Sequence, residues 1–319
     1  MILTLDDLKL ITKGVVAIEQ TTEGFEFQRF TSFQKSVLDK AADFGIKATA
    51  TSGVVLHFLC TGKELNLKFK SGQGSSRKII SFDCYVDNQM TYHYCQEPSE
   101  FEYEDEFSLT LPENECEVKI YFPNLNKIIL KKLSIEGSFR PVTQTVGKLL
   151  AYGDSITQGY DANYPSGSYA AILARHFNLE LVNRGIGGER FNAKVLAEEA
   201  DFMPEIVTIA YGTNDWVYRS FPVLTKKAKD FLFRISQLYS NVPVYCLLPI
   251  WRADENKDAK GGSLDEVRAF LKKEAEQYPN FKVIQPEFPH DITLFSDGYL
   301  HPNDEGFKIM AQSIIEQMK

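Results

Sequence analysis

The chain has 319 residues, more than twice the commonest domain size of roughly 100–150 residues, so its length predicts two domains. Hydrophobic residues make up 44% and charged residues 24%, which is typical of a globular protein with its own core. The formal net charge of −8 at pH 7 argues against a general nucleic-acid-binding protein, because such a protein would present a basic face.

The first ten residues lack a basic start followed by an unbroken apolar stretch, so we expect no secretory signal. No apolar run approaches the roughly 18 residues of a membrane span, which argues against a membrane partner. The five cysteines are scattered and form no close Cys-x-x-Cys pair, so neither a zinc site nor a disulfide framework is expected. Together these features favour a cytoplasmic protein.

The first part of the chain predicts an antiparallel β-domain. Its β-branched and aromatic residues fall into short runs that are separated by turn residues such as Thr61-Gly62-Lys63. The runs are 54–60, 64–69, 78–86, 90–95, 107–111, 117–122 and 128–135. Strands at intervals of 8–12 residues with few helical signals indicate a β-sandwich or jelly roll. Within the first 50 residues, 25–30 could add a strand and 31–44 has mixed signals, so these segments are left unassigned.

After a joint at residues 140–143, strand-like and helical patterns alternate. The strand-like runs are 148–152, 179–183, 206–211, 242–248 and 282–285, and the helical patterns are 169–177, 193–200, 224–239, 264–278 and 303–318. Alternation of this kind predicts a parallel sheet with helices on both faces, a three-layer α/β/α domain. We therefore divide the chain into a β-sandwich (jelly-roll) domain at 1–142 and an α/β/α domain at 143–319.

Polar residues follow several of the predicted parallel strands, at the ends where open α/β sheets bind ligands. These loops carry Gly153-Asp154-Ser155 after the first strand, 183–189 with three glycines after the second, Asn214 after the third, and His301 before the last helix. A serine, a glycine-rich turn, an asparagine and a histidine supply a nucleophile, oxyanion donors and a base. That set of residues predicts acyl-transfer chemistry.

With these motifs, the chain resembles the SGNH (GDSL-type) hydrolases over residues 145–319. All four sequence blocks of that family are present in order. The resemblance implies that Ser155 is the nucleophile and His301 the base. It also implies an oxyanion hole made by the N–H groups of Ser155 and Gly188 and the side-chain amide of Asn214.

The acid that orients the histidine departs from the family pattern. The family usually places it three residues before the histidine, whereas Asp297 stands four residues before His301. Some two-domain family members orient the histidine through a backbone carbonyl instead. We favour Asp297 as the third catalytic residue, with Asp291 and a main-chain carbonyl as the alternatives.

Other polar residues near the predicted site have a structural and a functional interpretation. Trp251 and Arg252 follow the fourth strand and could bind substrate, or could be a packed aromatic and a solvated arginine. Asp154 and Asp215 are expected to brace loops. His290 is the one rival base near this edge.

The pairing of a jelly roll with an SGNH domain resembles the two-domain carbohydrate esterases. This resemblance implies a serine esterase that hydrolyses short acyl esters through an acyl-enzyme, with O-acetyl groups on carbohydrate as the expected substrate. No metal or cofactor is expected, and the partner would be a small-molecule or oligosaccharide acyl ester. The alternatives are a lysophospholipase or thioesterase of the same fold, and a non-catalytic carbohydrate-binding protein. The oligomeric state and the role of the first domain stay open.

Overall fold

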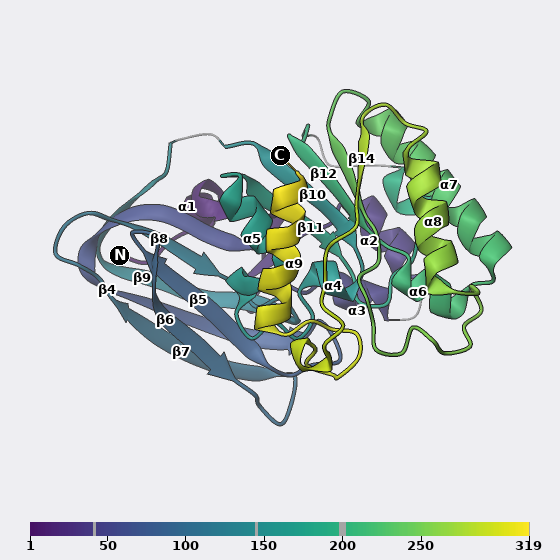
Figure 1. Cartoon of the computed structure of the whole chain (residues 1–319). Coiled ribbons are helices and arrows are strands. Elements are labelled where there is room, and N and C mark those ends of the chain that lie inside the picture. The colour runs from purple at the N-terminus through teal and green to yellow at the C-terminus, as the bar shows by residue number, and fades with distance from the viewer. Residues whose placement is uncertain (41–42, 144–145, 198–201, 319) are drawn as a thin grey trace.

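The computed structural model describes residues 1–40, 43–143, 146–197 and 202–318. Within these residues the strands form two sheets that lie side by side, one antiparallel and one parallel (Figure 1). None of the helices in the described parts of the chain is long and apolar enough to cross a membrane.

The antiparallel sheet has nine strands in the order β2-β3-β9-β4-β8-β5-β6, with β1 and β7 paired to β4, all counted over the described residues. The strands are β1 (Thr12–Lys13), β2 (Ala17–Gln20), β3 (Phe25–Gln28), β4 (Val55–Gln73), β5 (Ile80–Val86), β6 (Gln89–Gln96), β7 (Tyr103–Thr110), β8 (Cys116–Tyr121) and β9 (Asn126–Pro141). Alternate residues, such as Leu65, Leu67 and Phe69 of β4, are fully buried in one core. Burial of every second residue is typical of a sheet that packs one face against a core. The predicted β-sandwich is therefore confirmed.

The predicted turn at Thr61-Gly62-Lys63 is wrong. Strand β4 runs through it without interruption and pairs along its length with β9. The register shifts between Gly62 and Leu65, and Gly62 faces Gly137, which has a φ of 153°. A Cβ on either glycine would collide with backbone of the other strand, so this glycine pair permits a bulge where the sequence pattern indicated a turn.

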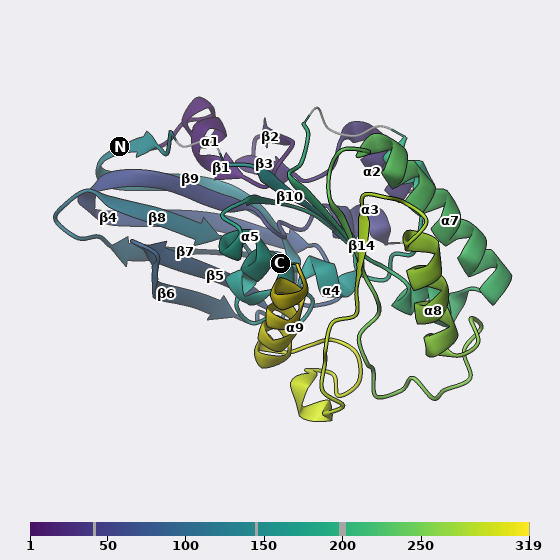
Figure 2. The ribbon, with the colours of Figure 1, turned by 45° about the horizontal axis from the view of Figure 1, so that its top comes forward.

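The first 50 residues contribute to both halves of the molecule. Helix α1 (Leu5–Ile11) packs on the antiparallel sheet, and β3 forms within 25–30, which the sequence left unassigned as a possible strand. Helices α2 (Ser32–Leu38) and α3 (Phe44–Ala48) lie in the other half (Figure 2). Phe30, Leu38 and Ala48 belong to the same hydrophobic core as the parallel strands. The division at 142/143 stays a prediction, since part of the first segment helps to build the second core.

The parallel sheet has five strands in the order β11-β10-β12-β13-β14 within the described residues. Its strands are β10 (Lys148–Gly153), β11 (Glu180–Gly185), β12 (Ile206–Ala210), β13 (Val244–Leu247) and β14 (Phe281–Ile284). The helices are α4 (Ser155–Gln158), α5 (Tyr169–His176), α6 (Thr213–Tyr218), α7 (Phe221–Leu238), α8 (Leu264–Ala275) and α9 (Asp304–Gln317), with 3-10 turns η1 (Pro165–Gly167), η2 (Ala193–Leu196) and η3 (Ile292–Leu294). The predicted helix at 193–200 is a 3-10 turn over 193–196, and its residues 198–200 lie outside the described residues.

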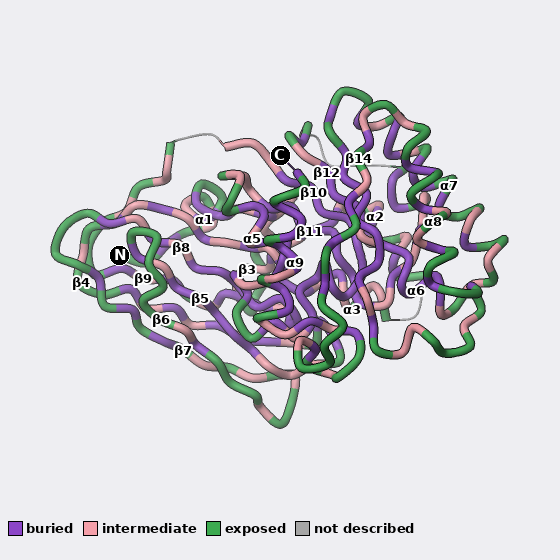
Figure 3. Tube along the Cα trace, viewed as in Figure 1, coloured by how far each residue is buried: buried purple, intermediate pink, exposed green. Residues whose placement is uncertain are grey.

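Strand β10 shows how the parallel sheet is buried on both faces. Leu150 and Tyr152 belong to the core that α7 and α8 cover, whereas Leu149 and Ala151 belong to the core that α5 and α9 cover. Figures 1 and 2 show these helix pairs on opposite faces of the sheet, and Figure 3 shows its strands as buried. The three-layer α/β/α architecture expected from the sequence is therefore confirmed.

Candidate active site

The serine expected as nucleophile lies just after β10, the strand between β11 and β12 in the parallel sheet. Strand β10 ends at Gly153, Asp154 caps the short helix α4, and Ser155 is its first residue. Ser155 is 5% exposed, and its Oγ lies 2.9 Å from Nε2 of His301. His301 comes from the loop before α9, 146 residues further along the chain. This distance is within hydrogen-bond reach, as the removal of the serine proton by a base requires.

Asp297 holds the other ring nitrogen of the same histidine. Its Oδ2 lies 2.7 Å from Nδ1 of His301, while its Oδ1 accepts the backbone N–H groups of Tyr299, Leu300 and His301. Burial alone would raise the pKa of Asp297, but the hydrogen bonds from His301 and the backbone lower it well below its ordinary value. The carboxylate therefore stays ionised and fixes the orientation of the imidazole.

The alternative acid does not reach the histidine in this geometry. Oδ1 of Asp291 accepts both the N–H and the hydroxyl of Thr293, at 2.9 and 2.7 Å, and so caps the turn η3. His290 stacks on Trp251, with ring centroids 4.8 Å apart. Of the groups weighed from the sequence, Asp297 and His301 are thus the pair that the structure brings to Ser155.

The three groups expected to bind an oxyanion follow the neighbouring strands β10, β11 and β12. Gly188 has a φ of 83°, a conformation that favours glycine, and a Cβ there would meet only Phe44 and Lys47. One N–H of the Asn214 amide donates to Oδ2 of Asp154 at 3.1 Å, which leaves its second N–H for another acceptor. Donors arranged in this way could meet a negative charge on a substrate oxygen.

Side chains from the first 50 residues support the glycine loop. Arg29 is completely buried and donates to the backbone oxygens of Asn183 and Gly185, at 2.7 and 3.3 Å. Lys47 donates to the backbone oxygen of Gly187 at 2.9 Å. Neither residue was singled out from the sequence. Because their partners lie about 140–155 residues away, no local pattern could have revealed them.

Three carboxyl groups are buried behind the candidate oxyanion donors. Burial raises the pKa of Asp154 to about 7, that of Asp215 to about 6 and that of Glu189 to about 8. Asp154 accepts from Ile156 and Asn214, and Asp215 accepts the N–H of Phe191. The two aspartates therefore hold loops in place.

The arginine expected at the substrate is occupied by intramolecular contacts. The side chain of Arg252 is 3% exposed and donates to both carboxylate oxygens of Asp254 and, at 2.7 Å, to the hydroxyl of Thr213. Trp251 is half-buried and lies against His290 and Phe295. Arg252 therefore braces the helix that carries Asn214, and substrate contacts of either residue stay a prediction.

One group in the described residues has the spacing of metal ligands, namely Asp161, Asp297 and His301, whose ligand atoms lie within 4.8 Å of one another. Asp297 and His301 are hydrogen-bonded to each other, and Asp161 is bound by Arg77. These contacts give the three residues an alternative use, so we assign no metal site to them.

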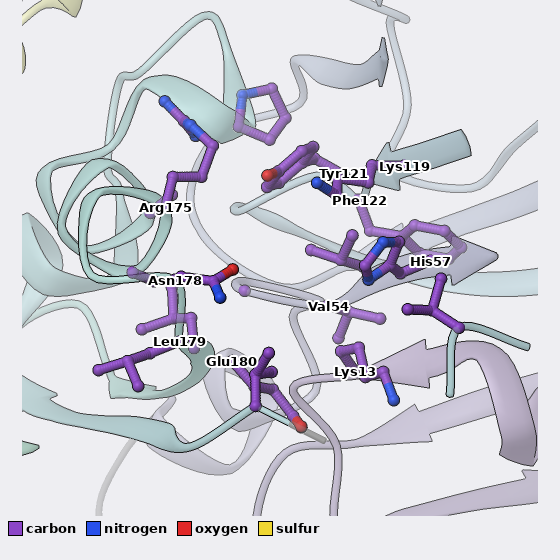
Figure 4. A pocket seen from close by; sticks show the side chains of 18 of the residues that line it. Lys13, Val54, His57, Lys119, Tyr121, Phe122, Arg175, Asn178, Leu179 and Glu180 are labelled. Carbon is purple, nitrogen blue, oxygen red and sulfur yellow. The ribbon is translucent and has the colours of Figure 1, made fainter. Parts of the chain in front are cut away.

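A cavity of about 270 Å³ lies between the two halves, away from this edge (Figure 4). Val54, His57 and Tyr121 line it from the antiparallel half, and Arg175 and Glu180 line it from the other half. Glu180 begins β11, and the candidate site follows the end of that strand. The cavity is thus at the opposite end of the parallel sheet from Ser155.

The α/β/α domain carries a serine, a histidine and an aspartate that are hydrogen-bonded in that order at the carboxyl ends of its strands. This is the architecture of the SGNH hydrolases. Residues 151–309 match the model of the GDSL-like lipase/acylhydrolase family. The chain therefore carries a GDSL-like lipase/acylhydrolase domain, the domain of an ester hydrolase. No curated protein matches the chain.

Solved structures share the fold of both halves at low sequence identity. The salicylyl-acyltransferase SsfX3 from a tetracycline biosynthetic pathway superposes with a TM-score of 0.86 at 19% identity, covering 100% of this chain and 96% of that chain. A family two carbohydrate esterase from Clostridium thermocellum, in complex with cellohexaose, gives 0.66 at 17% identity, covering 85% and 93%. An acetyl xylan esterase from Butyrivibrio proteoclasticus gives 0.61 at 15%, covering 85% and 91%.

Proposed function

We propose that the chain is a serine esterase that hydrolyses short acyl esters through an acyl-enzyme. The observation that carries this proposal is the continuous hydrogen-bond chain from Ser155 Oγ to His301 Nε2, at 2.9 Å, and from His301 Nδ1 to Asp297 Oδ2, at 2.7 Å. Such a chain allows a neutral serine to become a nucleophile as the imidazole takes its proton.

In the first half-reaction, Ser155 Oγ attacks the ester carbonyl carbon and His301 accepts the hydroxyl proton. Asp297 stabilises the imidazolium that forms. The carbonyl oxygen becomes an oxyanion, for which the N–H groups of Ser155 and Gly188 and the amide of Asn214 are the proposed donors. The tetrahedral intermediate then collapses, and the alcohol leaves with the proton from His301.

In the second half-reaction, water attacks the acyl-enzyme and His301 accepts a proton from it. Collapse of the second intermediate breaks the bond to Ser155, which regains a proton as the carboxylic acid departs. The hydroxyl of Ser155 and the imidazole of His301 carry out the proton transfers of this cycle, while the carboxylate of Asp297 stays ionised beside the imidazolium.

We propose O-acetyl groups on carbohydrate as the substrate. The support is the likeness to the two carbohydrate esterases over 85% of the chain, which includes both halves. A second candidate is acyl transfer to an alcohol acceptor, favoured by the likeness to the salicylyl-acyltransferase over the whole chain. Both reactions pass through the same acyl-enzyme and differ in whether water or an alcohol accepts the acyl group.

The test is hydrolysis of p-nitrophenyl acetate, butyrate and octanoate by the wild type, Ser155→Ala and His301→Ala. Acetate hydrolysis that both substitutions abolish would support the proposed mechanism, and release of acetate from acetylated xylo-oligosaccharides would support the substrate. Preference for octanoate would point instead to a lysophospholipase or thioesterase. Ester formation that outpaces hydrolysis when an alcohol is added would favour the acyltransferase. Full turnover by Ser155→Ala would refute the serine mechanism.

A further inference from the structure

An aromatic ring lies against the histidine of the proposed triad. Tyr160 follows α4 after one residue, Gly159, which has a φ of 88°. Its ring centroid is 4.8 Å from that of His301, with the two planes inclined by 32°. Tyr160 is 6% exposed. The ring therefore shields one face of the imidazole from water and limits the directions in which it can turn.

Two consecutive residues of the antiparallel domain hold Tyr160. They belong to the loop between β4 and β5, on the other half of the molecule. The backbone N–H of Ser76 donates to the Tyr160 hydroxyl at 3.2 Å, and the Ser76 hydroxyl also contacts it. The guanidinium of Arg77 lies 5.0 Å from the centre of the Tyr160 ring. The Tyr160 ring thus contacts both the guanidinium of Arg77 and the imidazole of His301.

Arg77 also binds a second carboxylate beside the histidine. Its Nε and Nη2 donate to the two oxygens of Asp161, at 2.8 and 3.1 Å. Oδ2 of Asp161 accepts from the Ser296 hydroxyl at 2.9 Å and lies 4.0 Å from Nδ1 of His301. The Asp161 side chain is 10% exposed, and its backbone has a φ of 65°, in the left-handed region.

We propose that Arg77 is a positioning residue for His301, acting through Tyr160 and Asp161, so that the antiparallel domain is part of the catalytic machinery. The proposal rests on the proposed role of His301 as the base. Tyr160 sets the orientation of the ring, and the Arg77–Asp161 ion pair sets the charge around it. The loop that joins β4 and β5 would then control the reaction from outside the α/β/α domain.

The charges around the imidazole predict in which direction each substitution changes the protonation of His301. Asp297 faces Nδ1 directly, Asp161 lies behind it, and Asp154 acts on the ring from the start of α4. Arg77 offsets the charge of Asp161, while Arg252 acts on Asp154. Removing Arg77 leaves the negative charge of Asp161 uncompensated, which favours the imidazolium form of His301. Neutralising Asp161 leaves the positive charge of Arg77 uncompensated, which disfavours the imidazolium. The two substitutions therefore push the protonation of the base in opposite directions.

The test measures kcat/KM against pH for Arg77→Gln, Asp161→Asn and the double variant. The acid limb of the profile reports protonation of the base in the free enzyme. We expect it to move up by about 0.5–1 pH unit in Arg77→Gln, down by a similar amount in Asp161→Asn, and back close to the wild-type position in the double variant. Arg77→Lys keeps the charge but loses the planar fork, so we expect a normal acid limb with a several-fold lower kcat.

Arg140→Gln is the matched control, because Arg140 makes a similar two-point contact with Glu115 on an exposed part of the same domain. It should leave the profile unchanged. Shifts of both single variants in the same direction, or unshifted profiles with normal kcat, would overturn the proposal. If Arg77→Gln does not fold, Asp161→Asn alone decides by the direction of its shift. Activity that survives in Ser155→Ala would instead contradict the serine mechanism. This outcome distinguishes failure of the proposed function from failure of the proposed role of Arg77.

Discussion

Asp297 binds His301 through one oxygen and the backbone of the intervening loop through the other. Oδ2 reaches Nδ1 at 2.7 Å, and Oδ1 accepts three consecutive backbone N–H groups at 2.8–3.1 Å. The loop therefore folds around the carboxylate, and Gly298 within it has a φ of 77°. This folding accommodates a separation of four residues where the family usually has three.

If Asp297 orients the base, Asp297→Ala should lower kcat/KM by on the order of 10⁴-fold, since loss of the acid in serine-hydrolase triads has effects of that size. Asp291→Ala is the control from the same loop and should change kcat/KM less than about threefold. The measurement is steady-state hydrolysis of p-nitrophenyl acetate by both variants. A larger loss in Asp291→Ala than in Asp297→Ala would exchange their roles, and a small loss in both would favour a backbone carbonyl.

Asn214→Ala should reduce kcat by about 10²–10³-fold with little change in KM, because an oxyanion donor acts mainly on the transition state. Thermal unfolding of the same variant checks the loss of its hydrogen bond to Asp154. Asn192→Ala, which removes the side-chain cap of η2, is the control and should keep normal kcat. A rise in KM at unchanged kcat would place Asn214 in ground-state binding instead.

Glu189 predicts a specific dependence of stability on pH. Burial raises its pKa to about 8, from an ordinary value of 4.5. Between these two values the folded state keeps a proton that the unfolded state releases, so this carboxyl lowers the free energy of unfolding as pH rises, by about 1.4 kcal/mol per pH unit. Below pH 4.5 the contribution vanishes, and above pH 8 the loss is complete.

Glu189→Gln removes this titration, and its amide oxygen can still accept from the Tyr211 hydroxyl, as the Glu189 carboxyl group does at 3.1 Å. The stability of the variant relative to the wild type should therefore grow from pH 5 to pH 8 and then level off. Urea unfolding at four pH values measures this difference. The exposed Glu276→Gln is the control. A difference that does not change with pH would contradict the buried-carboxyl interpretation.

Arg252→Ala should lower the free energy of unfolding by about 2 kcal/mol, because Thr213 and Asp254 lose a buried donor. If Arg252 braces the helix of Asn214, kcat should fall several-fold while KM stays within twofold. Lys257→Ala removes the other, more exposed partner of Asp254 and should have little effect on either quantity. A selective rise in KM for Arg252→Ala would restore its predicted contact with substrate.

The sequence indicated much of the site because the signals are local. Ser155 and Asn214 both lie at the start of the helix that follows their strand, and parallel strands bring their carboxyl ends to one edge whatever lies between them in sequence. Arg29 and Arg77 could not be found in this way. Each binds a residue of the other half, and the sequence pattern around the arginine carries no information about a partner so far along the chain.

The fold shows the same contrast between local and distant causes. The alternation of apolar runs in 148–315 predicted the parallel sheet and its helices, since each element signals its own period. The bulge at Gly62 depends on Gly137 in another strand, so the sequence around Gly62 resembled an ordinary turn. In the same way, α2 has the capping box of a helix start at Thr31 and Gln34, but its apolar face packs against strands that come more than 100 residues later.

That packing of α2 and α3 has a consequence for how the chain is made. These helices leave the ribosome well before the strands that cover them, and at about 5–20 residues per second the delay is on the order of 10 s. Leu38 and Ala48 would be exposed to the cellular environment during that interval. The antiparallel half can close earlier, but the enzyme as a whole folds late, so we expect slow refolding and a dependence of yield on chaperones.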